Sequence, residues 1–178
     1  EETQILEIIS AIESINYTLK HLQNWMMIKN AKLPWWFKFG SAKVLHEPVG
    51  IVGIIVPWNY PLCLALEPLI SAVAAGNRVM LKMSSLTPHT TIALEKLLSE
   101  VFSMQEVQVV PGGDNVNEEF IKLPFDHLFF TGSKEVGKKV LAIASENFIP
   151  VTLELGGKSP CIVEKDATVE SVNEAFKK

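Results

Sequence analysis

The sequence contains few cysteines, no excess of positive charge and no long apolar run. Two cysteines, Cys63 and Cys161, occur among 178 residues, which is too few for a disulfide framework. The 16 lysines and arginines are outnumbered by 20 aspartates and glutamates, so the formal net charge is -4 and no basic stripe for nucleic acid is visible. Apolar stretches are interrupted, for example at Pro57, Asn59 and Glu67, well short of the roughly 20 residues that cross a membrane. We therefore expect a reduced, cytoplasmic protein that binds neither nucleic acid nor a membrane.

Two motifs of nucleotide-binding proteins are absent or incomplete. The dinucleotide fingerprint Gly-x-Gly-x-x-Gly does not occur. Residues 132–139 nearly match a phosphate-binding P-loop, but Lys139 stands where a Ser or Thr should bind Mg²⁺. A P-loop nucleotide-binding domain is therefore one rival hypothesis. The histidines and cysteines have no metal-ligand spacing, so the sequence predicts no metal site.

The composition and patterning predict an α/β protein. Hydrophobic residues make up 48% of the chain and charged residues 20%, a globular balance. Residues 3–28 carry apolar side chains at helical spacing, which predicts a long amphipathic helix, and residues 33–37 predict an irregular aromatic connector. Thereafter short apolar runs alternate with helical patterns, as in a mostly parallel, Rossmann-like sheet with helices on both faces. We divide the chain into an N-terminal helix and connector, 1–46, and a Rossmann-like domain, 47–178.

The predicted elements of the second part are as follows. Strands are expected at 51–56, 78–82, 106–110, 127–130, 151–154 and 161–164. Helices are expected at 62–75, 89–102, 116–121, 134–145 and 169–177. In such a sheet the ligand binds beyond the carboxyl ends of the strands, so candidate site residues are sought there.

Two of these strand ends offer groups for a phosphorylated ligand. Gly132 follows a strand directly and permits a sharp turn, and Ser133 opens a helix whose first N–H groups favour phosphate. The alternative is an ordinary Ser N-cap. Lys82 ends another strand, where its ammonium could hydrogen-bond ribose hydroxyls or be a solvated strand end.

Two further strand ends offer groups for chemistry. Asn59 lies between Pro57 and Pro61, so its amide could be aimed rigidly at a developing oxyanion or could cap the following helix. Glu154 ends an apolar strand and is followed by two glycines. Burial would raise its pKa, which suits a general base, whereas a surface salt bridge is the alternative. Each pattern alone leaves both interpretations open.

Taken in order, the motifs resemble the aldehyde dehydrogenase superfamily over essentially the whole chain. They are Pro-Trp-Asn-Tyr-Pro at 57–61, Gly-Asn at 76–77, Lys82 followed by Thr-Pro at 87–88, Phe-Thr-Gly-Ser at 130–133 and Leu-Glu-Leu-Gly-Gly-Lys-Ser-Pro at 153–160. Residues 150–161 resemble the class 3 branch. Residues 47–61, together with Lys-Met-Ser at 82–84, resemble the bacterial coniferyl aldehyde dehydrogenases.

The resemblance implies an aldehyde substrate, NAD or NADP as cofactor, and a cysteine nucleophile whose thioester is hydrolysed by water. Asn59 would be the oxyanion donor and Glu154 the base. Lys82 would bind the adenosine ribose, and Ser85 replaces a Glu that the family often has beside that ribose. The remaining residues would contact the cofactor: Thr131, Gly132, Ser133 and Gly137 at the pyrophosphate, Leu155 and Gly156 at the nicotinamide, and Trp58 and Gly113 at its flanks.

The nucleophile itself is not expected among these residues. In the family it lies in a Gly-Gln-x-Cys segment, which would fall beyond Lys178. Cys63 and Cys161 are both predicted to behave as small buried hydrophobes, although the place of Cys63 at a helix start could lower its pKa. We therefore expect the cofactor-binding part of an enzyme that is a homodimer when intact and inactive as this chain. The alternative is a non-catalytic NAD(P)-binding fragment.

Overall fold

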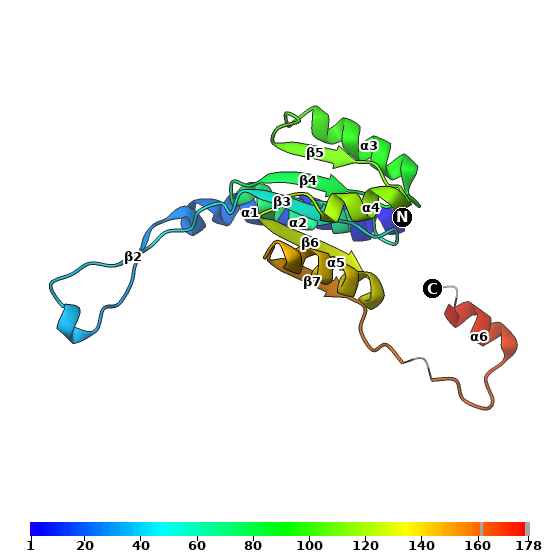
Figure 1. The fold of residues 1–178 in the computed structure, drawn as a ribbon. Coiled ribbons are helices and arrows are strands. Elements are labelled where there is room, and N and C mark those ends of the chain that lie inside the picture. Colours follow the sequence, from blue (N-terminus) through cyan, green and yellow to red (C-terminus); the bar gives the residue numbers. More distant parts are fainter. Residues whose placement is uncertain (161, 177–178) are drawn as a thin grey trace.

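A five-stranded parallel sheet lies at the centre of the computed structural model, which describes residues 1–160 and 162–176 (Figure 1). The strand order is β5-β4-β3-β6-β7. The strands are β3 (Ile51–Ile55), β4 (Arg78–Lys82), β5 (Val107–Val110), β6 (His127–Gly132) and β7 (Val151–Leu155). These five strands and their parallel arrangement confirm the predicted fold class.

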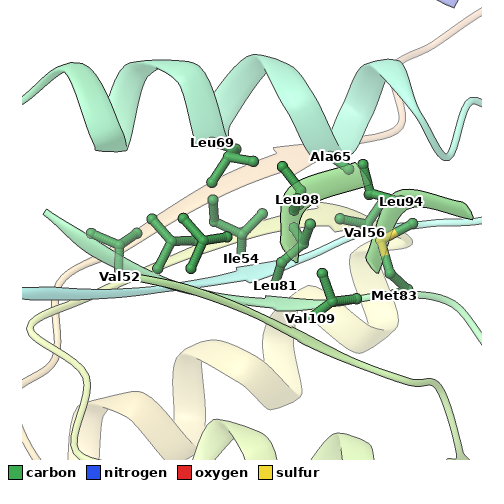
Figure 2. Close-up of a cluster of buried hydrophobic side chains, with 12 residues drawn as sticks. Val52, Ile54, Val56, Ala65, Leu69, Leu81, Met83, Leu94, Leu98 and Val109 are labelled. Carbon is green, nitrogen blue, oxygen red and sulfur yellow. The ribbon is translucent and has the colours of Figure 1, made fainter. Parts of the chain in front are cut away.

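Helices cover both faces of the sheet. Successive residues of each strand point to opposite sides, so the apolar strands place hydrophobic side chains on both faces, and the helices bury them. Figure 2 shows the first face, where Ile54 and Leu81 pack with Leu69 and Leu94 from two helices. On the second face Phe130 packs in a separate cluster with side chains of two other helices. The helices of the first face are α2 (Cys63–Ala74) and α3 (Pro88–Ser99), and those of the second are α4 (Asp114–Ile121) and α5 (Lys134–Glu146).

The path of the chain creates a reversal in the middle of the sheet. From the central strand β3 the chain moves outward through β4 to β5, then crosses back to β6 and continues outward to β7. In register, Ile55 of β3 lies opposite Phe130 of β6. Loops leaving β3 and β6 therefore diverge to opposite faces, and a crevice forms beyond their carboxyl ends.

The predicted N-terminal helix is present as a six-residue π-helix, η1 (Gln4–Ile9), followed by α1 (Ser10–Met26). It rests on α2 through Glu7, Ala11 and Ser14, which share one face at spacings of four and three residues. The apolar stripe that predicted the helix is largely exposed; it includes Ile5, Ile8, Ile9, Ile12, Ile15 and Leu19.

Two parts of the prediction were wrong in detail. The aromatic connector predicted as irregular at 33–37 contains the short 3-10 helix η2 (Trp35–Phe37). An antiparallel pair, β1 (Lys29–Asn30) and β2 (Lys43–Val44), flanks it, and this arm projects from the body of the molecule (Figure 1). Residues 162–164 form no strand, and Ile162 is 85% exposed. After β7 the chain leaves the sheet, so these residues have no neighbouring strand to bond (Figure 1). Cys161 lies outside the described residues, and α6 (Val169–Phe176) follows.

Candidate functional site

Two hollows meet at the crevice between β3 and β6. One, the edge cavity, has a volume of about 310 Å³ and lies between the ends of β4 and β6. The other, the face groove, has a volume of about 1080 Å³ and runs along the first face beside α2. Five residues line both hollows: Pro57, Trp58, Thr131, Gly132 and Ser133. The loops that leave β3 and β6 thus form a wall common to the two spaces.

The edge cavity gathers six of the predicted cofactor-binding residues, of which Trp58, Thr131 and Gly132 belong to the shared wall. Lys82 and Ser85 line it from the end of β4, and Ser133 lines it from the start of α5. Lys82 is only 3% exposed, and its Nζ donates to the carbonyl oxygen of Met83 at 3.1 Å. It is therefore a buried cation beside a cavity, which removes the alternative of a solvated strand end.

Ser133 is the N-cap of α5, with Oγ accepting from the backbone N–H of Val136 at 3.3 Å. The loop between β6 and α5 is this single residue, and Gly137 lies within the helix. A Cβ added at Gly137 would lie 2.8 Å from Leu155 Cδ2, so Gly137 allows α5 to pack closely on β7. A P-loop needs a run of non-helical residues to surround phosphate, so the geometry rejects that hypothesis.

The loop after β5 contributes a glycine that the sequence analysis missed. A Cβ at Gly112 would lie 2.2 Å from the backbone nitrogen of Ser85, so only glycine permits this contact between the two loops. The predicted residue, Gly113, is the N-cap of α4 and is not among the residues that line the edge cavity. The available signal was the Pro-Gly-Gly sequence at 111–113, directly after a strand.

The face groove brings together the predicted chemical residues. Asn59 and Glu154 both line it, with Leu155 and Gly156 at the same end of the sheet. Glu154 is exposed, contrary to the burial expected for it. It lies on β7, whose neighbour in the described sheet is β6 alone, and α5 packs on the opposite face of these strands, leaving this side open to the groove.

Asn59 does not cap α2. The N-cap residue Leu62 has no side-chain cap of its own, and the carboxylate of Glu7 takes that role. Glu7 Oε2 accepts from the backbone N–H of Leu62 at 2.8 Å and of Cys63 at 3.3 Å. Sequence reasoning missed Glu7 because it is 55 residues from its partner and carries no local motif. The Asn59 side chain is exposed at the groove.

Two titratable groups near the groove have altered pKa values. Burial raises the pKa of the Cys63 thiol, and the negative charges of Glu67 and Glu7 raise it further. The helix start therefore does not lower the pKa of this thiol, and Cys63 is half-buried where the sequence predicted burial. Burial lowers the pKa of His127, whose Nε2 lies 3.0 Å from Thr152 Oγ1.

Among residues 1–160 and 162–176, no three His, Cys, Asp or Glu side chains are grouped so as to hold a metal ion. In that part of the chain no helix has both the length and the apolar character needed to cross a bilayer.

Comparison with known proteins gives the family. The aldehyde dehydrogenase family model matches residues 1–178. This chain belongs to the aldehyde dehydrogenase family. It is 48% identical over 98% of its length to a probable coniferyl aldehyde dehydrogenase of Pseudomonas aeruginosa, of which it covers 37%. Its relatives also include members of aldehyde dehydrogenase family 3, which confirms the predicted branch.

Solved aldehyde dehydrogenases share the fold. Staphylococcus aureus AldH, in a substrate-bound state, superimposes with a TM-score of 0.87 at 44% identity, covering 92% of this chain and 36% of that one. The Mycobacterium tuberculosis enzyme complexed with NAD+ gives a TM-score of 0.78 at 34% identity, covering 88% and 32%. The chain therefore spans little more than a third of the length of the relatives that it matches.

Proposed function

We propose that this chain is the cofactor-binding part of an NAD(P)-dependent aldehyde dehydrogenase, with residues 47–178 as its Rossmann-like domain and 1–46 as an N-terminal extension. The observation that carries the proposal is the meeting of the two hollows at one crevice. The edge cavity holds the buried Lys82 and the start of α5, and the face groove beside it holds Asn59 and Glu154. This separates groups suited to binding from groups suited to chemistry.

The residues of the edge cavity fit a dinucleotide chemically. A dinucleotide presents ribose hydroxyls and a negatively charged pyrophosphate, which call for hydrogen-bonding groups and positive potential. Lys82 and Ser85 would hold the adenosine ribose. The start of α5 at Ser133, with its helix dipole and first-turn N–H groups, would hold the pyrophosphate, flanked by Thr131 and Gly132. A structural relative was solved in complex with NAD+.

The nicotinamide end would lie toward the face groove. Leu155 and Gly156 line the groove beside Glu154, and Trp58 belongs to the wall that both hollows share. A Cβ at Gly156 would meet no atom within 4 Å, so the backbone there has open space for a ligand. Gly137 would act indirectly by packing α5 on β7, and Gly113 would end the loop that flanks the ribose end.

The groove residues would then assist aldehyde oxidation. When bound, the dinucleotide supplies the acceptor for the hydride that leaves the substrate carbon. The Asn59 amide would donate a hydrogen bond to the oxyanion formed when a cysteine thiolate attacks the aldehyde. Glu154 would take a proton from the water that hydrolyses the thioester. Cys63 is unsuited to nucleophilic attack because its thiol pKa is raised, so we place the nucleophile in another part of the intact enzyme.

The substrate class and setting are carried over from the relatives. Similarity to a probable coniferyl aldehyde dehydrogenase favours aromatic aldehydes, with medium-chain aliphatic aldehydes as the second choice. We place the intact enzyme in the cytoplasm as a homodimer.

The test is to titrate NAD+ and NADP+ into the 178-residue chain by calorimetry, with and without Mg²⁺. We expect saturable binding that does not need the metal and that weakens in Lys82→Met, which keeps the apolar stem. Lys96→Met, at an exposed position of α3, is the matched control. Adding an aldehyde should produce no reduced cofactor. Absent or Mg²⁺-dependent binding would overturn the proposal.

A further inference from the structure

The start of α2 is held by a carboxylate from the far N-terminal part of the chain. Glu7 is 7% exposed, one of three polar or charged side chains identified as buried in the described residues. Its Oε2 accepts two backbone hydrogen bonds, from Leu62 at 2.8 Å and Cys63 at 3.3 Å. A buried carboxylate is costly unless it is compensated, and here the N–H groups and the positive end of the α2 dipole compensate it.

Glu7 lies within the π-helix η1 (Gln4–Ile9), which leads directly into α1, and it shares one face with Ala11 and Ser14. Farther along the same face, Ser14 Oγ donates to Glu67 Oε2 at 2.8 Å and makes a third hydrogen bond to α2. The N-terminal helix is therefore attached to α2 by three hydrogen bonds, two through Glu7 and one through Ser14.

The segment fixed by Glu7 is the exit of the loop that carries Asn59. At the loop's entrance, the N–H of Val56 donates to the carbonyl oxygen of Lys82 at 3.0 Å, which holds it to the sheet. At its exit, Glu7 binds the N–H groups of Leu62 and Cys63. Only six residues separate Val56 from Cys63, and two of them are prolines with fixed φ. In a loop this short, the positions of the two ends determine the path of the backbone between them, including Asn59.

We propose that Glu7 is a positioning residue for Asn59, because it fixes the backbone at the start of α2 and so sets where the Asn59 amide lies in the face groove. The inference rests on the proposed function, in which that amide donates to the oxyanion. It assigns a role in the chemistry to a residue of η1, which lies at the N-terminal end of α2. Glu7 itself lines neither the edge cavity nor the face groove.

The first test is a double-mutant cycle on aldehyde oxidation by the intact enzyme. We expect Glu7→Ala to lower kcat about tenfold, part of the roughly hundredfold loss typical when an oxyanion donor is removed, with an unchanged KM for the dinucleotide. Glu7→Gln keeps an acceptor oxygen and should restore most of the rate. In an Asn59→Ala background, Glu7→Ala should have little further effect, because it acts through the missing amide. Glu13→Ala, exposed on α1, is the matched control.

The second test needs no activity: amide hydrogen exchange in the 178-residue chain. Glu7→Ala should speed exchange at Leu62 and Cys63 about tenfold or more while leaving Ile54 in the core unchanged, and Glu7→Gln should reverse most of this. Unchanged exchange at both amides, or kcat effects of Glu7→Ala and Asn59→Ala that simply add, would overturn the inference. If Asn59→Ala leaves kcat unaltered while the exchange result holds, the role proposed for Asn59 in the reaction fails, and the positioning role in catalysis fails with it.

Discussion

Lys82 and Glu154 occupy similar places at the ends of parallel strands but differ sharply in burial. Lys82, on β4, lies between β3 and β5 and is 3% exposed, whereas Glu154 lies on β7 and is exposed. Because Leu81 faces the first side of the sheet, Lys82 faces the second side, where Ile121 of α4 and Val140 of α5 line the same cavity. Because Leu153 packs on the second side, Glu154 faces the first side at the edge of the sheet. The edge cavity is thus lined by strand ends together with α4 and α5, and the face groove is open along β6 and β7. Burial at a strand end depends on the covering layer, not on the strand's sequence.

If the two hollows divide binding from chemistry, variants in each should affect one property and spare the other. The largest effect is expected from Glu154→Gln in the intact enzyme. The amide cannot take a proton from water, so thioester hydrolysis should slow about a hundredfold or more, the usual contribution of a general base. Cofactor affinity should stay within about twofold because side-chain shape is kept. Pre-steady-state kinetics should still show the burst of reduced cofactor while steady turnover falls.

A matched control for this prediction is Glu146→Gln, which removes an exposed carboxylate at the end of α5. It should leave both phases unchanged. If Glu154→Gln keeps full turnover, Glu154 is an ordinary strand-end residue. If it instead abolishes cofactor binding, the division between the two hollows is wrong.

The sheet was predictable because a local run of apolar residues marks each of its strands. The apolar run Val-Met-Leu at 79–81 gave the bounds of β4 without error, and the continuous apolar character of β3 fits a strand buried on both faces. The antiparallel pair β1 and β2 was missed because two residues per strand leave no periodicity to read. The strand expected at 161–164 is not formed by residues 162–164, because an apolar run becomes a strand only beside another strand with which it can hydrogen-bond.

The candidate site was predictable only in part, for the same reason. Motifs identified Lys82, Ser133 and Asn59 because strand ends of a parallel sheet converge at one edge. Glu7 and Gly112 were missed because their importance arises from contacts between distant segments. The exposure of Glu154 could not be read from its own strand, since it depends on which helix covers that face.

The second-largest effect is expected at the start of α5, where capping and ligand binding can be separated. Aspartate is as good an N-cap as serine, so Ser133→Asp should keep the unfolding free energy of the chain. Its negative charge would oppose the pyrophosphate, and we expect dinucleotide affinity to fall about tenfold to a hundredfold. Ser133→Asn keeps the cap without the charge and should bind nearly as well as the parent. Equal affinities of the two variants for the dinucleotide in calorimetry would show that the pyrophosphate does not bind at the start of α5.

A smaller effect is expected at Ser85, on the ribose side of the edge cavity. A carboxylate there would accept hydrogen bonds from both ribose hydroxyls and repel a 2′-phosphate. With Ser85 in its place the intact enzyme should use both NAD and NADP, and Ser85→Glu should shift kcat/KM toward NAD about tenfold, roughly 1.4 kcal/mol. Ser99→Glu, at the exposed end of α3, should shift nothing. A parent enzyme that favours NAD by several orders of magnitude would contradict the prediction.

The smallest effect concerns His127, which lines the face groove at the amino end of β6. Glu154, on the neighbouring strand β7, lies opposite Thr131, nearer the carboxyl end of β6. Burial lowers its pKa below the ordinary value of 6.5, so the unfolded chain binds a proton more readily than the folded one. Stability should therefore fall as pH drops through about 6.5 and stop falling once the folded form is also protonated. Urea unfolding at pH 7.5 and 5.5 should show a smaller loss in His127→Gln than in the parent, because carboxylate contributions cancel in the comparison. Equal losses of unfolding free energy in the parent and in His127→Gln would mean that the partial burial of His127 beside Thr152 has no energetic consequence. The open side of the groove would then be as well hydrated as the rest of the surface.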